Sequence, residues 1–176
     1  MNKFSRFIVV ITAGIVLLHS PIGAEDFNSG SEPDGFGGLI WGTKIAGLKG
    51  MKLVRRDAGP GGEEIYTASH LSPLFCGVRV GRVEYGFWKG QLWKVSLLTA
   101  GRDSYLELRE AVFKCFGAGE LEAAPRPGIT RFSWVGGITR MVLTYEDRTE
   151  SGSLVITSRR IADDIIDRTM TAGEDD

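Results

Sequence analysis

The chain has 176 residues, enough for one domain of ordinary size, and its 21 Lys and Arg nearly balance its 22 Asp and Glu. Proteins that bind nucleic acid through surface charge carry a strongly basic face, so this composition argues against a nucleic-acid partner. A hydrophobic fraction of 43% is typical of a globular protein with a buried core.

The first residues have the three parts of a secretory signal peptide. Lys3 and Arg6 give a basic start, residues 7–18 form an apolar run, and Ala24 is a small residue at a cleavage position. The run is too short to span a bilayer. We therefore expect residues 1–24 to be removed during export to the periplasm or the medium, with no stable membrane insertion afterwards. An uncleaved anchor and a buried core helix are the alternatives.

Three segments follow the expected cleavage site. Residues 25–38 are acidic and rich in Gly, Ser and Pro, which predicts a flexible lead-in. Residues 39–170 carry the alternating apolar patterns of a single folded domain. Residues 171–176 read as a polar tail that frays.

Within this domain the patterns predict a short helix, three strands, a helix, three strands and a last helix. The first helix would begin near Thr43, and the others would span residues 104–116 and 159–168. The six predicted strands cover residues 63–69, 78–87, 91–99, 130–134, 138–145 and 153–157. Tight turns between successive strands favour antiparallel pairing. The predicted fold class is α+β: a single twisted antiparallel sheet of about six strands with helices packed on one face.

The strands on either side of residues 88–90 predict a hairpin whose loop length follows from side-chain alternation. A two-residue loop would put Tyr85 and Phe87 on the face opposite to Trp93. A three-residue loop over residues 88–90 places all three aromatic groups on one face, and Gly90 suits its left-handed position. We therefore predict the three-residue loop.

Trp88 and Lys89 of this turn are the predicted contacts for a partner, because a Trp in a tight turn is difficult to bury. The opposite sheet face is expected to be a solvated, mixed-charge surface. Its expected basic residues are Arg79, Arg82, Lys94, Arg131 and Arg140.

Cys76 and Cys115 leave two alternatives open. In an oxidising compartment they would form one disulfide, and otherwise they would be two buried thiols. Cys76 also lies six residues after His70, but this spacing does not establish a thiol nucleophile with a base.

The remaining motifs give no catalytic residue, metal site or cofactor. The chain has no C-x-x-C pair and no paired histidines, so zinc is not expected. Its Gly-rich segments lack the Lys-Ser/Thr of a phosphate-binding loop. The charges of residues 159–168 are interpreted as a solvated helix face rather than a calcium site.

Several short sequence features lie between Leu39 and Ser158. They are Trp41-Gly42, Tyr85-x-Phe87, Gly90-x-Leu92, Phe116-Gly117 and Trp134. In these features the chain resembles small exported bacterial proteins of unknown function, and its order of helices and strands is similar to that of the SmpA/OmlA and β-lactamase-inhibitor-protein group. SmpA/OmlA members are usually lipoproteins; this chain lacks the lipidated cysteine, which argues against their membrane-assembly role here.

These observations favour an exported, non-catalytic envelope protein. It would bind an envelope protein or a small ligand through the uncovered sheet face and the Trp88 turn. The alternative is a small secreted hydrolase that uses carboxylates or Cys76.

Overall fold

The computed structural model describes residues 27–57, 62–68, 74–123 and 126–172. The predicted signal peptide, His70 and the end of the polar tail lie outside these residues. In the described part of the chain, no helix is long and apolar enough to cross a membrane.

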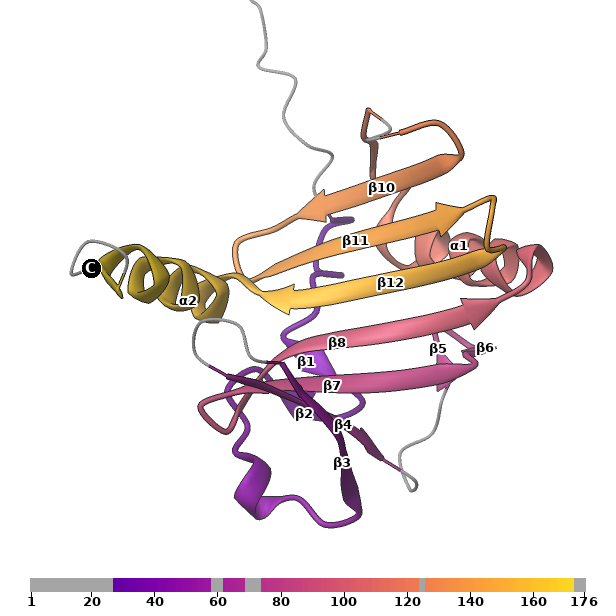
Figure 1. Cartoon of the computed structure of the whole chain (residues 1–176). Coiled ribbons are helices and arrows are strands. Elements are labelled where there is room, and N and C mark those ends of the chain that lie inside the picture. Colours follow the sequence, from indigo (N-terminus) through magenta and orange to yellow (C-terminus); the bar gives the residue numbers. More distant parts are fainter. Residues whose placement is uncertain (1–26, 58–61, 69–73, 124–125, 173–176) are drawn as a thin grey trace, which may run out of the picture.

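The fold is mostly β, and the predicted α+β sheet of about six strands with helices on one face is wrong (Figure 1). The main sheet has eight antiparallel strands, in the spatial order β3 (Met51–Asp57), β4 (Glu63–Ala68), β7 (Arg82–Trp88), β8 (Gln91–Ala100), β12 (Ser151–Ser158), β11 (Thr139–Glu146), β10 (Ile129–Val135) and β9 (Glu120–Leu121). Two small sheets pair β1 (Gly35–Phe36) with β2 (Leu39–Ile40) and β5 (Leu74–Phe75) with β6 (Val78–Arg79). The helices are a 3-10 turn η1 (Ile45–Gly47), α1 (Arg102–Phe116) and α2 (Arg159–Ala172).

The first predicted helix is replaced by η1 and the edge strand β3. Gly47 and Gly50 weaken a helix, and Gly50 has a positive φ of 73°, which ends any regular helical path before β3 begins at Met51. The spacing of Leu48, Met51 and Leu53 suggested a helix, but Met51 and Leu53 lie in a strand paired with β4. Local periodicity was therefore overridden by sheet pairing.

The β7–β8 hairpin has a two-residue turn, so the predicted three-residue loop is wrong. Lys89 and Gly90 have φ of 49° and 70°, as two-residue hairpin turns require. Phe87 pairs with Leu92, and a register shift just before Phe87 leaves Trp93 as the extra residue of a β-bulge. The bulge keeps Phe87 on the buried face with Tyr85, as the alternation argument required, and removes Trp93 from it.

Alternation along the strands gives the sheet one apolar face. The fully buried apolar side chains of its central strands include Val95, Leu97, Leu154, Ile156, Met141 and Leu143. They belong to one core cluster with residues of α1 and the N-terminal segment. This face is the sheet's contribution to the core.

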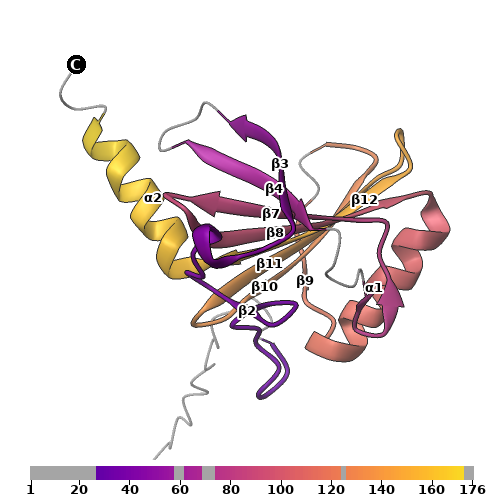
Figure 2. The same cartoon turned by 90° about the horizontal axis from the view of Figure 1, so that it is seen from below.

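Helix α1 covers part of this apolar face (Figure 2). Its buried residues Tyr105, Leu108 and Val112 recur at helical spacing, so they form one stripe against β8 and β12. Gly117, with φ of 97°, ends the helix, and its N–H donates to the carbonyl of Phe113. The predicted helix over residues 104–116 is thus present from Arg102 to Phe116.

Residues 27–38 are packed against the same side, which differs from the flexible lead-in that their composition predicts. The Asn28 N–H donates to the Phe116 carbonyl at 3.0 Å, and Glu32 accepts from the N–H groups of Ile138 and Thr139 at 2.6 and 2.7 Å. Phe36 is buried in the core. Figure 2 shows β2 and α1 on the same side of the sheet.

Cys76 and Cys115 form a disulfide, which decides between the two alternatives for these residues. Their Cα atoms are 6.4 Å apart, and the described residues contain no free cysteine. The bond joins the β5–β6 turn to the last turn of α1. It therefore links two of the segments that cover the apolar face.

Helix α2 projects beyond the end of the sheet (Figure 1). Ile161 is buried, and its N–H reaches the Ser158 hydroxyl at 3.5 Å, as expected for an N-terminal cap. Ile166 and Met170 are exposed. Unlike α1, this helix does not cover the apolar face, which is a second reason why the predicted layout is wrong.

Replacing both cysteines by serine should lower the free energy of unfolding by about 4 kcal/mol, because the bond closes a loop of 39 residues in the unfolded chain. Urea denaturation of the oxidised protein and the Cys76→Ser/Cys115→Ser variant measures this difference. Equal midpoints and slopes would show that the bond contributes no stability.

The Gly152→Ala substitution should destabilise the protein by about 1–3 kcal/mol, because overpacking forces neighbours to shift. A Cβ at Gly152 would lie 2.7 Å from the Tyr105 ring, at the contact between β12 and α1. The control is Gly47→Ala, where a Cβ meets nothing within 4 Å. Thermal unfolding should separate the two variants; similar melting temperatures would contradict the close helix–sheet contact.

Candidate functional site

The second face of the main sheet is open. One row across five strands consists of directly paired residues, in the order Glu84, Ser96, Val155, Val142 and Ser133. Within the described ranges no helix lies over this row, and in Figure 1 α1 lies behind β11 and β12. The open face is therefore a surface of small and polar side chains.

Four of the five basic residues expected on this face lie there. Register places Lys94 in line with Arg140, and Arg82 in line with Arg131, on the same side as Ser96. Arg79 instead belongs to β6 of a small sheet. The strand pattern predicted the charged face correctly wherever the strand itself was in the main sheet.

Most of these cations are paired with carboxylates. Glu84, whose side chain is 8% exposed, accepts from Arg55 at 3.0 Å and from Arg82 at 2.8 Å. Glu122 lies between Arg131 and Arg140 at 3.7 and 3.6 Å. The open face is thus an ordered network of opposite charges rather than a free cationic patch.

A more deeply buried ion pair lies near the β7–β8 turn. Glu63 Oε2 is 2.6 Å from Lys94 Nζ, and the two side chains are only 14% and 22% exposed. They lie across Gly86, where a Cβ would collide with Glu63 Oε1. Glycine at this position therefore lets the pair lie flat on the sheet.

Two tryptophans at this end of the hairpin contact cations. Lys94 Nζ lies 5.0 Å from the centre of the Trp93 ring. Trp88 lies between two cations, with Lys89 Nζ at 4.7 Å and the Arg168 guanidinium of α2 at 5.7 Å. Glu63, Trp88, Trp93 and Lys94 are called the indole cluster below.

The two predicted partner contacts, Trp88 and Lys89, differ in exposure. Lys89 is exposed at the tip of the turn, whereas Trp88 is only 4% exposed. The turn did not leave Trp88 bare because Trp88 ends β7, and Lys89 and Arg168 lie over its ring. A ligand could reach this indole only after one of these long side chains moves.

The indole cluster concentrates buried polar atoms that have no hydrogen-bond partner. They are Glu63 Oε1, Trp88 Nε1 and Trp93 Nε1, half of the six such side-chain atoms in the described residues. A buried polar group without a partner costs about 1–3 kcal/mol, so three in one place require an explanation. Two donors and one acceptor beside an open face are what a binding site for polar groups provides.

The pKa shifts near the cluster do not indicate acid–base catalysis. Hydrogen bonds from Arg56 and Tyr66 lower the pKa of Glu64. Burial raises the pKa of Tyr85 to about 12. Both shifts move away from neutral pH, where a general acid or base is most effective.

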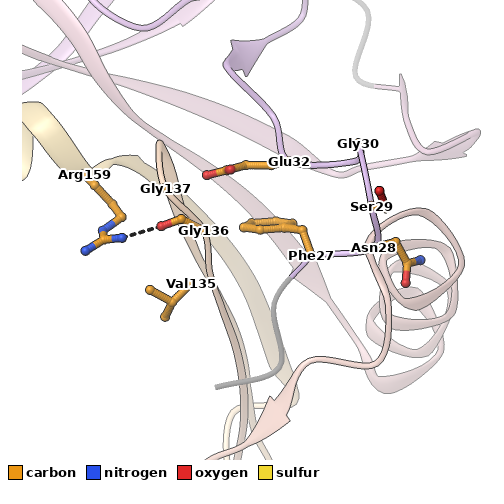
Figure 3. A pocket seen from close by; sticks show the side chains of 9 residues that line it. All are labelled: Phe27, Asn28, Ser29, Gly30, Glu32, Val135, Gly136, Gly137 and Arg159. Carbon is orange, nitrogen blue, oxygen red and sulfur yellow. Dashed lines mark hydrogen bonds between the residues drawn. The ribbon is translucent and has the colours of Figure 1, made fainter. Parts of the chain in front are cut away.

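A hollow of about 470 Å³ lies apart from the open face, between residues 27–32, the β10–β11 turn and the start of α2 (Figure 3). Phe27 and Val135 supply its apolar surface, and Glu32 and Arg159 supply its charges. This hollow was not predicted, because the composition of residues 25–38 indicates a flexible lead-in.

Other candidate chemistry is limited. Among the described residues, no group of three His, Cys, Asp or Glu side chains could hold a metal ion. The Cys76 sulfur is bonded to Cys115, so it is not a free thiolate, and His70 lies outside the described residues. No protein family, curated protein or solved structure matches the chain.

The Glu63–Lys94 pair should show a coupling energy of about 1–3 kcal/mol in a double-mutant cycle, because both groups are largely removed from water. The cycle uses Glu63→Gln, Lys94→Met and the double variant. The control is the exposed pair Arg126–Glu146, whose Arg side chain is 64% exposed. Equal coupling in the two cycles would contradict the special burial of the cluster.

Proposed function

We propose that this protein is an exported, non-catalytic binding domain whose open sheet face contacts a partner protein of the cell envelope. The observation that carries the proposal is the indole cluster: three buried polar atoms without partners at one end of a sheet face that no described helix covers. A partner that supplies hydrogen bonds to these atoms would recover their desolvation cost.

The composition of the open face suits protein recognition. Trp and Arg are the side chains that most often dominate protein–protein binding energy. Here Arg168 lies over the Trp88 ring, and Arg82, paired with Glu84, lies at the other end of the same strand. The ion-pair network holds its charges in fixed positions, which favours one partner orientation over others.

Catalysis has weaker support. The hydrolase alternative relied on carboxylates or on Cys76. Cys76 is bonded to Cys115, and the carboxylates of Glu63 and Glu84 are each held by basic side chains. These two carboxylates therefore take part in ion pairs of the sheet face.

Export rests on two supporting features. The basic and apolar pattern of residues 1–24 is typical of a signal peptide. The Cys76–Cys115 disulfide is compatible with an oxidising compartment outside the cytosol. We therefore place the binding domain in the periplasm or outside the cell.

The Ser96→Arg substitution should abolish partner capture, because it adds a long charged side chain at the centre of the open face. The matched control is Ser104→Arg on the exposed surface of α1. Both variants and wild type are cross-linked in an intact envelope fraction, and the captured proteins are compared by mass spectrometry. We expect one protein to be captured by wild type and Ser104→Arg and lost with Ser96→Arg.

A second substitution tests the indole cluster itself. Trp93→Phe removes one unpaired N–H and keeps an aromatic ring, so capture should fall by at least about tenfold if that N–H meets the partner. The proposal would be contradicted if neither Ser96→Arg nor Trp93→Phe changed capture. It would also be contradicted if the wild-type protein captured no specific partner.

A further inference from the structure

We propose that the hollow beside α2 binds a small zwitterion, either a free amino acid or a short peptide with both of its charged ends. This site is separate from the open sheet face, so it stands or falls independently of the function proposed above. Its walls come from residues 27–32, the β10–β11 turn and Arg159 (Figure 3). Its volume of about 470 Å³ lies within the range of small-molecule sites.

The walls of the hollow are held in place by hydrogen bonds. Glu32 Oε1 accepts from the N–H groups of Ile138 and Thr139 at 2.6 and 2.7 Å. Gly136 admits this carboxylate, because a Cβ there would collide with it. On the other side Arg159 Nη1 donates to the Gly136 carbonyl. A site fixed in this way loses little conformational entropy when a ligand binds.

The charges of the hollow are opposite in sign and do not neutralise each other. Glu32 and Arg159 both line it, yet within the described residues neither forms an ion pair. Glu32 Oε2 and the remaining N–H groups of Arg159 thus keep free capacity. A guanidinium binds a carboxylate with two parallel hydrogen bonds, and a carboxylate accepts from an ammonium group.

The uncharged lining fits the middle of such a ligand. Figure 3 shows the Phe27 ring between Glu32 and Val135. Phe27 also packs edge-on against Phe116 of α1, with ring centres 6.0 Å apart, so its position is fixed by the core. An aliphatic side chain or peptide backbone of the ligand would lie on this apolar surface, with its two charged ends toward Arg159 and Glu32.

The test compares ligands that differ by one charged group. Isotope-labelled wild-type protein is titrated by NMR with L-leucine, L-leucinamide and 4-methylpentanoate, and with a panel of free amino acids and dipeptides. L-Leucinamide lacks the carboxylate and 4-methylpentanoate lacks the ammonium group. We expect at least one zwitterion of the panel to shift the resonances of residues 135–137, and its single-charge analogues to bind at least tenfold more weakly.

Two variants identify the residues that bind each end. Glu32→Gln keeps a carbonyl acceptor for the two backbone N–H groups but removes the negative charge, and Arg159→Gln removes the positive charge. Each should weaken binding at least tenfold, whereas Arg126→Gln, at the opposite end of β10, should not. Absence of binding by every zwitterion up to 10 mM (about the weakest affinity expected of so small a ligand), or analogues that bind equally well, would overturn the proposal.

Discussion

The alternation of side chains along the central strands of the main sheet is the constraint on which the rest of this structure depends. Every second residue of the central strands faces one side. The sheet therefore has a wide apolar surface, from Tyr85 to Trp134, that other segments of the chain must cover. Helix α1 spans only part of it. The N-terminal segment and the β5–β6 turn, which is bonded to α1 through Cys76 and Cys115, complete the cover.

The same alternation determines what is left for function. Because all the covering segments lie on one side, the opposite face keeps its small residues and its ion pairs in contact with water over most of its area. Parts of it are buried, among them Glu84, Ser133 and the end near the β7–β8 turn, where Glu63 and Lys94 lie flat over Gly86 beside Trp93. The structure thus combines one face covered by disulfide-linked segments with an opposite face that carries ion pairs and, near the β7–β8 turn, three buried polar atoms without partners.

Features that depend on local pattern could be predicted from the sequence. The amphipathic stripe of Leu108 and Val112 gave α1 to within two residues of its observed start, and alternation correctly placed Lys94 and Arg140 on the uncovered face. The hairpin shows the limit of this reasoning. The demand that Tyr85 and Phe87 share a buried face was right, but a bulge at Trp93 met it where a longer turn was expected.

Features that depend on distant contacts could not be predicted. Glu32 lies in a segment of low apolar content, and its partners are backbone N–H groups more than 100 residues away, which no composition rule detects. Strand β3 owes its existence to pairing with β4, since only Leu53 and Val54 of its exposed centre are apolar. The burial of Trp88 likewise depends on Arg168, from the far end of the chain. The hairpin pattern therefore predicted where the candidate site lies, but not which other residues belong to it.

The most direct test of this account is to measure how accessible the two faces of the sheet are to solvent. A soluble gadolinium chelate is added to methyl-labelled protein, and the broadening of each methyl resonance is recorded. The account predicts strong broadening for Val142 and Val155 on the open face, and sharp signals for Leu154 and Ile156 beneath α1 and the N-terminal segment. Equal protection of the two sets would show that the second face is covered as well, and would contradict the account.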